Sequence, residues 1–568
     1  MANGMRAEVA MGLDVETLHG RRATDPVHRM VVGDVLERLT WSRPDHEAIV
    51  GWSGAYADPA FARLTYRETD RLANRVAHAL LAAGLRRSDR VLLYCENSVE
   101  AVLVMIGIAK AGLVCVPVNP LLAPDVLSSA IAHVEPSFAI VDAEMWPTGQ
   151  AAFGRAGLAP AVTITLGGGP VPGTVSFSDW VADRPDTAPE PEVALHADDI
   201  WIMLFTSGTT ALPKAAMCSH TYSYMAAFSF VGPLTRGVRH DHDMRLATFL
   251  PIVYHCGHNA GVLPAFFTGG TVVLGRRFEP TQVCAAITQE RVTALWAGAP
   301  RFLELMVGAA EADPAVDLGS LKLGMFAWGA MHGDVARRLR ALCGEELQLL
   351  EVFGQSEAMS CFRFWLDEHP EKVEASGGVV NHVGVPNPVL AADIQTADGE
   401  SLLGVVGVPG EAVYRSPVVA AGYYRNAEAT AETFRDGWFR SGDSCQYEPD
   451  GQQILVDRYK DVIKTGGENV ASVRVEAVLD QHPDVARSAV IGVPDPHWGE
   501  MVVAVVIPAE GRAPDRSELI AFCRARLAGY ETPKRIEFVD AFPETVGAKI
   551  LKYKLRERFA TPAADAGH

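Results

Sequence analysis

The chain has 568 residues but few lysines, no closely paired cysteines and no long apolar run. Its nine cysteines include no C-x-x-C pair, so we expect reduced thiols rather than a zinc site or a disulfide framework. A signal peptide is not expected, because residues 1–20 contain no apolar run that is long enough. A membrane span is not expected either, because the most apolar stretch, residues 101–118, is interrupted by Lys110 and Gly112. A formal net charge of −19 argues against a general binder of nucleic acids or anionic membranes. Composition therefore predicts a globular, cytoplasmic protein.

Short apolar runs alternate with amphipathic segments over much of the chain. The clearest runs are residues 90–95, 113–118, 271–275, 323–328 and 348–353. Runs of this length, separated by helix-period segments, are typical of buried parallel strands joined by crossover helices. The predicted fold class is therefore α/β, with phosphate-binding groups at the carboxyl ends of the strands.

The segment TSGTTALPK, residues 206–214, follows one such apolar run. Four hydroxyl side chains and the backbone N–H groups around a glycine can surround phosphate oxygens, and a lysine adds positive charge. The glycine spacing is not that of the common nucleotide triphosphatases. A Ser/Thr/Gly turn alone is more often an ordinary surface loop, so the other motifs decide its meaning. The phosphate-binding candidates are Thr206, Ser207, Gly208, Thr209, Thr210 and Lys214.

Further motifs follow in order: EVFGQSE at 351–357, GWFRSGD at 437–443, VDRYKDVIKTGGEN at 456–469 and FPETVGAKILK at 542–552. With the phosphate-loop segment, these five motifs resemble those of the adenylate-forming superfamily, in its acyl-CoA synthetase branch. The superfamily also contains nonribosomal-peptide adenylation domains and beetle luciferases. The resemblance covers about residues 30 to 558.

The resemblance implies a role for each matched residue. The adenylate would be bound by Gly329, Ala330, Phe353, Gly354, Ser356, Asp443 and Arg458. It further implies Glu357 as the Mg²⁺ ligand, Lys460 as the hinge, Gly466 and Gly467 beside the CoA tunnel, Lys549 and His255 as catalytic residues, and Gly257, His258 and Trp328 in the acyl pocket. Without the motifs, Phe353 and the histidines would be interpreted as core residues, and Asp443 as a turn-capping residue.

The resemblance also implies the architecture and the reaction. Residues 1–459 would form a large domain of two doubly wound α/β subdomains plus a distorted β-barrel, and residues 460–568 a small, mobile α+β domain carrying Lys549. A carboxylate would attack the α-phosphate of ATP in the presence of Mg²⁺, and the thiol of coenzyme A would then attack the acyl adenylate. Lys549 would serve the first step, while rotation at Lys460 would prepare the second.

Several positions depart from the family pattern. Ala211 and the pair Gly547-Ala548 stand where the family has glycine or a hydroxyl, and Ser472 and Arg474 replace a usual Pro and Glu. Two readings stay open: a complete ligase, or an enzyme that only transfers a preformed acyl adenylate to CoA and needs a partner adenylating enzyme. A luciferase-like oxygenase and a nucleotide sensor are further alternatives with less support in the motifs.

The substrate is predicted only by class. No Asp or Glu lies between Leu246 and Arg277, where amino-acid-activating relatives place a carboxylate, so a nonpolar acid is expected. Glycines at 257, 261, 329 and 354 favour a bulky acid, as in secondary metabolism. Trp328 stands where the family usually has a small residue. The resemblance implies that His255 is the gate between the acyl pocket and the CoA tunnel. Because the segment before His255 has one residue more than the family pattern, His258 is a second candidate for this gate.

Overall fold

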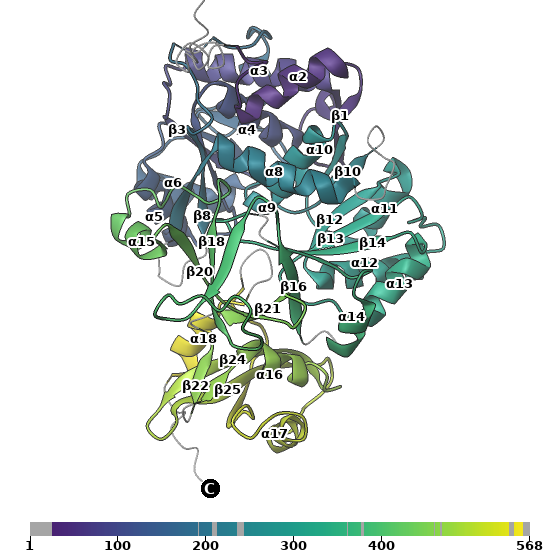
Figure 1. Cartoon of the computed structure of the whole chain (residues 1–568). Coiled ribbons are helices and arrows are strands. Elements are labelled where there is room, and N and C mark those ends of the chain that lie inside the picture. Colours follow the sequence, from purple (N-terminus) through teal and green to yellow (C-terminus); the bar gives the residue numbers. More distant parts are fainter. Residues whose placement is uncertain are drawn as a thin grey trace, which may run out of the picture.

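The computed structural model describes residues 25–190, 192–206, 213–235, 244–359, 362–376, 380–458, 461–465, 468–544 and 550–560. These residues form three sheets with helices packed against them (Figure 1). In this part of the chain no helix is both long and apolar enough to cross a membrane.

The first sheet has seven strands in the order β7-β6-β5-β3-β4-β8-β9, parallel except for β9. Its central strands β3, β4 and β5 consist of apolar runs buried on both faces, as expected for parallel strands covered by helices. The strands are β3 (Arg90–Tyr94), β4 (Val114–Val118), β5 (Phe138–Asp142), β6 (Val162–Ile164), β7 (Val175–Ser176), β8 (Ile200–Thr206) and β9 (Lys214–Ser219). The helices of this region are α2 (Val35–Ser42), α3 (Tyr66–Ala82), α4 (Val99–Lys110), α5 (Pro124–Val134), α6 (Trp146–Ala156), α7 (Phe177–Val181) and α8 (His220–Thr235), with short turns η1 (Val32–Asp34) and η2 (Pro59–Phe61).

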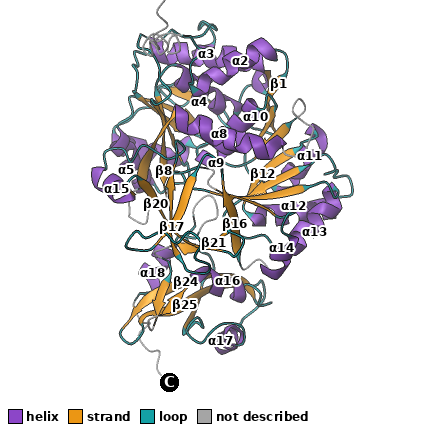
Figure 2. Cartoon of the chain, in the orientation of Figure 1, coloured by secondary structure: helices purple, strands orange, loops and turns teal. Residues whose placement is uncertain are grey.

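The second sheet has fourteen strands, and its middle part is parallel. The strands of that part and its antiparallel edge are β1 (Glu47–Trp52), β2 (Arg63–Thr65), β10 (Arg245–Thr248), β11 (Thr271–Gly275), β12 (Ala294–Gly298), β13 (Leu323–Phe326) and β14 (Gln348–Phe353). Helices line it, among them α11, α12 and α13 (Figure 2). The helices of this region are α9 (His255–Gly257), the π-helical turn η3 (His258–Val262), α10 (Leu263–Phe267), α11 (Pro280–Glu290), α12 (Pro300–Ala312), α13 (Gly333–Cys343) and α14 (Pro370–Ser376).

The strands expected to form a small barrel are antiparallel and continue the second sheet through β15. They are β15 (Phe362–Trp365), β16 (Asn381–Pro386), β17 (Ala391–Gln395), β18 (Gly410–Arg415), β19 (Phe434–Arg435), β20 (Trp438–Tyr447) and β21 (Gln453–Arg458), with helix α15 (Ala427–Thr433). The α/β prediction is confirmed, and each of the five apolar runs named above overlaps a strand.

A third sheet lies at the C-terminal end, below β20 and β21 in Figure 1. Its elements are β22 (Ile463–Thr465), β23 (Glu468–Val470), α16 (Ser472–Leu479), β24 (Val485–Asp495), β25 (Gly499–Pro508), α17 (Arg516–Arg524), β26 (Arg535–Phe538) and α18 (Lys552–Phe559). This sheet has its own apolar core on each face. The predicted boundary residue Lys460 lies outside the described residues, so the boundary stays a prediction.

Ser472 joins the large unit to the small one. Its N–H and its hydroxyl both donate to the carboxylate of Asp457 on β21, the former at 2.7 Å, and Lys552 on α18 donates to the Ser472 hydroxyl. Proline, the usual family residue at 472, has no N–H and could make neither bond. The departure noted in the sequence therefore creates a contact between the two units.

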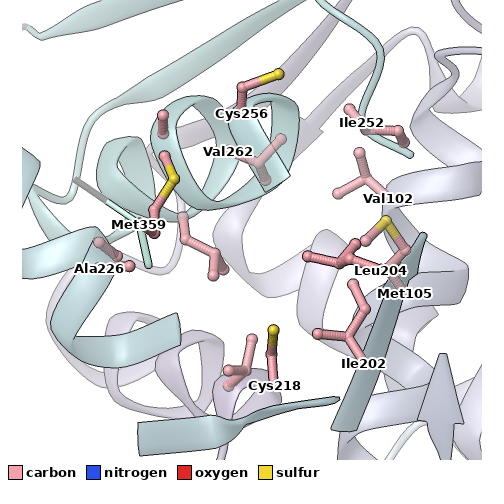
Figure 3. Packing of buried hydrophobic residues seen from close by; sticks show 14 of the residues in the cluster. Val102, Met105, Ile202, Leu204, Cys218, Ala226, Ile252, Cys256, Val262 and Met359 are labelled. Carbon is pink, nitrogen blue, oxygen red and sulfur yellow. The ribbon is translucent and has the colours of Figure 1, made fainter. Parts of the chain in front are cut away.

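The largest apolar core lies between the first two sheets. Figure 3 shows side chains converging there from α4 (Val102, Met105), β8 (Ile202, Leu204) and the segment containing α9 and η3 (Cys256, Val262). Every residue of α4 is buried, because both ends and all faces of this helix are covered by protein. The helix thus holds the two sheets against each other.

Helix α4 ends in a lysine whose side chain is fully buried. Lys110 Nζ lies 2.6 Å from Glu37 Oε1 and 2.8 Å from Asp70 Oδ1. Removing one partner of such a cluster leaves charges without compensation in the interior. Lys110→Met should therefore lower the free energy of unfolding by about 3–5 kcal/mol in urea titrations.

A lysine with a partly exposed side chain provides the control. Lys322 pairs with Glu346 at 3.2 Å on the surface, and Lys322→Met should cost less than about 1 kcal/mol. Equal effects of the two substitutions would contradict the role given to Lys110.

Candidate active site

The candidate residues gather where the two large sheets meet. Phe353 ends the parallel strand β14, and Thr206 ends β8. The hydroxyl of Tyr222 on α8 donates to the Ser356 carbonyl at 2.9 Å, which fixes the segment after β14 against the first sheet. Carboxyl ends of parallel strands are the usual place for nucleotide binding in such folds.

Asp443 and Arg458 form an ion pair at the centre of the site. They face each other across β20 and β21, with Asp443 Oδ1 2.9 Å from Arg458 Nη1. The amide of Gln355 donates to the second Asp443 oxygen. The Asp443 carboxylate raises the pKa of the Arg458 guanidinium further above its usual value. The motifs predicted that both residues contact the nucleotide, and the structure places the two side chains next to each other.

Gln355 was not among the predicted site residues. It lies between Phe353 and Glu357 in the second motif, and its side chain is buried against Asp443. An amide at this place fixes the carboxylate through hydrogen bonding without adding charge. Its position inside a recognised motif was the available signal.

The aromatic ring of Phe353 is half-buried beside Phe362, with 5.9 Å between centroids and an angle of 55°. The space next to Gly329 is open, since an added Cβ there would meet no atom within 4 Å. Ala330 is half-buried in the same segment, and Gly354 is half-buried directly after Phe353. A flat ring and an open backbone at one sheet edge could receive an adenine.

Lys214, Tyr423 and Glu357 form the other side of the site. Lys214 pairs with Thr206 across the β8–β9 hairpin, and its Nζ lies 4.8 Å from the centre of the Tyr423 ring. The Tyr423 hydroxyl donates to Glu357 Oε1 at 2.7 Å. Burial, and then the Glu357 charge, raise the pKa of Tyr423 well above its usual value, so it remains a donor. Sequence reasoning missed Tyr423, for which the Gly-Tyr-Tyr run at 422–424 was the only signal.

Glu357 could hold a magnesium ion. Within the described ranges no group of three or more His, Cys, Asp or Glu side chains could bind a metal by itself. Mg²⁺ usually binds one or two carboxylates and completes its shell with phosphate oxygens and water. A single carboxylate that is oriented by the Tyr423 hydroxyl fits that pattern.

His255 and His258 occupy the turn after β10. His255 Nδ1 contacts the sulfur of Met359, and burial lowers the pKa of His255 to about 3, with a smaller effect of His258. Burial likewise lowers the pKa of His258 to about 4, while its Nδ1 lies 3.0 Å from the Ile252 carbonyl oxygen. Both rings are therefore neutral at pH 7. His255 lies beside the segment after β14, whereas His258 faces Trp201 in the core.

Two glycines near these histidines are tightly packed. An added Cβ at Gly257 would lie 2.3 Å from the Pro251 carbonyl oxygen, and one at Gly261 would lie 3.0 Å from Thr248. These glycines allow close backbone contact. They provide no support for a large acyl pocket.

Several predicted residues lie outside the described residues. They are Ser207, Gly208, Thr209, Thr210 and Ala211 of the phosphate loop, Lys460, Gly466 and Gly467, and Gly547, Ala548 and Lys549. The residues flanking the last segment, Glu544 and Ile550, form an antiparallel bridge.

Two family models match most of the chain. The family model of the AMP-binding enzymes matches residues 37–424, and that of the AMP-binding enzyme C-terminal domain matches residues 474–549. Feruloyl-CoA synthase of Amycolatopsis sp. is 35% identical over 499 residues, which are 87% of this chain and 94% of that protein. The long-chain-fatty-acid–CoA ligase FadD13 of Mycobacterium tuberculosis is 30% identical over 534 residues, 92% of this chain and 99% of that protein. The crystal structure of ATP-bound MatB from Rhodopseudomonas palustris superposes with a TM-score of 0.78 at 27% identity, covering 93% of this chain and 99% of MatB.

The chain therefore belongs to the AMP-binding enzyme family, in the acyl-CoA ligase branch of the adenylate-forming superfamily. It is an acid–thiol ligase, and enzymes of this branch use ATP and CoA. The family predicted from the five motifs is confirmed, whereas the roles of single residues stay predictions.

The buried histidines make stability depend on pH. Burial lowers the pKa of His220 to about 3, as it does for His255, while the unfolded chain has the ordinary value near 6.5. Their stabilising effect is thus complete above pH 6.5 and is lost as the pH falls toward the folded pKa values, because the unfolded state binds protons first. Each such histidine should steepen the fall of the unfolding free energy with decreasing pH by about 1.4 kcal/mol per pH unit.

His258→Gln tests this expectation. The variant should show a shallower loss of unfolding free energy between pH 6 and pH 5 than the wild type, by about 1.4 kcal/mol per pH unit. His28→Gln, which changes a largely exposed histidine, should leave the slope unaltered. Identical slopes in all three proteins would show that His258 is not buried in its neutral form.

Proposed function

We propose that the protein joins a nonpolar carboxylic acid to coenzyme A through an acyl adenylate. The observation that carries this proposal is the Asp443–Arg458 pair with Gln355 bound to it, beside the Phe353 ring. The ionised Asp443 carboxylate is a hydrogen-bond acceptor, and ribose hydroxyls are donors that such a group can bind. The CoA ligase relatives support the same reaction.

In the first step a carboxylate oxygen of the acid attacks the α-phosphorus of ATP. A new O–P bond forms, and the bond to the departing pyrophosphate breaks. Negative charge gathers on the phosphate oxygens, where fixed cations are most effective. We propose Arg458 and Lys214 for this role, with Lys549 joining them. Glu357 would hold Mg²⁺, which supplies further positive charge when bound.

In the second step the CoA sulfur attacks the acyl carbon. The C–S bond forms while the C–O bond to AMP breaks, so acyl-CoA and AMP are the products. The thiol must lose its proton before it attacks. Burial lowers the pKa of His255 to about 3, which makes it a weak base, so we propose it as the gate between the acyl pocket and the route of the thiol. Its Nδ1 contacts Met359 in the segment after β14. Gly466 and Gly467 are the proposed route of the thiol, and Lys460 the hinge between residues 1–459 and 460–568.

The environment of the site supports a nonpolar acid. Trp296, Trp328, Phe302 and Leu250 gather around Gly298 at the end of β12, and all four are apolar or aromatic. We place the protein in the cytoplasm, in keeping with its reduced cysteines.

Asp443→Asn tests the proposal. The substitution keeps the size of the side chain but removes the charge that would accept the ribose hydroxyls. Because hydrogen bonds to charged groups contribute about 1.5–3 kcal/mol, AMP affinity should fall roughly 10- to 100-fold in calorimetry. Both half-reactions should slow, since both require the AMP portion to be held. Asp450→Asn, which changes an exposed carboxylate paired with the half-buried Lys372, is the matched control and should behave as wild type. Unchanged AMP affinity in Asp443→Asn would contradict the proposal.

A second assay separates the complete ligase from the transfer-only alternative, which rests on Ala211 and Gly547-Ala548. Acid-dependent exchange between pyrophosphate and ATP is compared with thioester formation from synthetic acyl adenylate and CoA, using the same acid. Brisk exchange establishes the complete ligase that we propose. Turnover of the adenylate without exchange would establish the alternative and imply a partner adenylating enzyme.

A further inference from the structure

Trp328 has an unusual backbone conformation at the site. Its φ angle is +71°, in the left-handed region that bulky residues seldom adopt. Its side chain is 50% exposed, although tryptophan is generally among the more buried residue types. Unfavourable backbone conformations persist only where the surrounding structure enforces them, and they cluster at ligand-binding sites. The position of Trp328 thus calls for a functional explanation.

The indole of Trp328 lies over the end of β12. Its Cζ3 would lie 3.0 Å from an added Cβ at Gly298, whose own φ is +87°. Its ring centre lies 6.4 Å from that of Trp296, at an angle of 49°. Trp296 in turn donates its indole N–H to the Cys256 carbonyl at 2.8 Å, next to His255. The indole therefore occupies space that a small residue at 328 would leave open.

The rings around Trp328 are held firmly. Phe302, at the start of α12, stacks on Phe278 with 4.2 Å between centroids and an angle of 17°. An added Cβ at Gly298 would also lie 2.8 Å from Leu250 and 3.3 Å from Phe302. Because these neighbours are packed together, the indole has little room to move toward β12. A long flexible chain entering along β12 would meet the indole.

We infer that Trp328 determines specificity: its indole closes the acyl site along β12 and selects flat aryl acids over long straight-chain acids. This inference rests on the proposed function. A flat ring can stack on the exposed indole face, which contributes energy beyond burial alone. A long alkyl chain would have to displace the indole. The free energy needed for this displacement makes the site favour aryl acids over long straight-chain acids.

The test compares cinnamic acid and palmitic acid as substrates for the wild type, Trp328→Ala and Trp328→Gly. We measure kcat/KM for acyl-CoA formation from each acid, and from its synthetic adenylate. The wild type should prefer cinnamic acid. Both variants should lose about tenfold on cinnamic acid, through the lost stacking, and gain at least tenfold on palmitic acid.

Two controls distinguish substrate selection by Trp328 from a purely structural role of this residue. Trp41→Ala removes a tryptophan that is 82% exposed on α2, and it should leave the preference unchanged. Trp328→Gly suits a positive φ angle, so its melting temperature should equal or exceed that of the wild type, whereas Trp328→Ala should melt below Trp328→Gly.

The outcomes distinguish the two claims. If no acid and no adenylate gives a thioester with the wild type, the proposed function fails. If the wild type is active but its preference is the same in both Trp328 variants, or favours palmitic acid from the start, the proposed function stands and the role of Trp328 is overturned. Variants that bind AMP normally but make neither thioester would also overturn it.

Discussion

The site depends on one ion pair, between the buried Asp443 and the half-buried Arg458. These residues face each other on neighbouring antiparallel strands, so the sheet itself sets their distance. Gln355 joins them from the segment after β14, and that segment is tied by Tyr222 to the first sheet. A buried carboxylate is tolerated only when charges and hydrogen-bond donors compensate it. The pair and Gln355 therefore hold the segment after β14 against β20 and β21, and they fix the carboxylate that we propose as the acceptor for the ribose.

The same region is close to the small C-terminal unit. Asp457 precedes Arg458 on β21, and its carboxylate accepts both Ser472 donors at the start of α16. The strand that carries Arg458, the arginine proposed to bind the nucleotide, thus also carries the contact between units. In the proposed function, nucleotide binding and the position of the small unit would be linked through these two adjacent residues.

Much of this could be predicted from the sequence. Parallel strands such as β3, β11 and β14 were recognisable because apolar runs buried on both faces have a clear pattern. The ordered motifs gave the family and brought Asp443 and Arg458 together, which the structure agrees with. Gln355 and Tyr423 were missed because their role depends on contacts with residues distant in the sequence, Asp443 for one and Lys214 and Glu357 for the other.

The glycines show the limit of such reasoning more sharply. Gly257, Gly261 and Gly329 look alike in the sequence, yet the first two pack against backbone or side-chain atoms and the third faces open space. The role of each glycine depends on which atoms its α-carbon faces, and only the fold determines those atoms. Similarly, the sequence identifies Trp328 as a departure from the small residue of the family pattern. Only its φ angle and its neighbours show what space the indole fills.

The most direct measurement is a crystal structure with a nonreactive acyl-adenylate analogue, the sulfamoyl analogue of cinnamoyl adenylate. We expect the ribose hydroxyls to donate to Asp443 while Arg458 and Gln355 stay bound to it, with the adenine on Phe353 and the aryl ring against Trp328. An analogue whose ribose makes no contact with Asp443, or which binds away from the end of β14, would contradict this account.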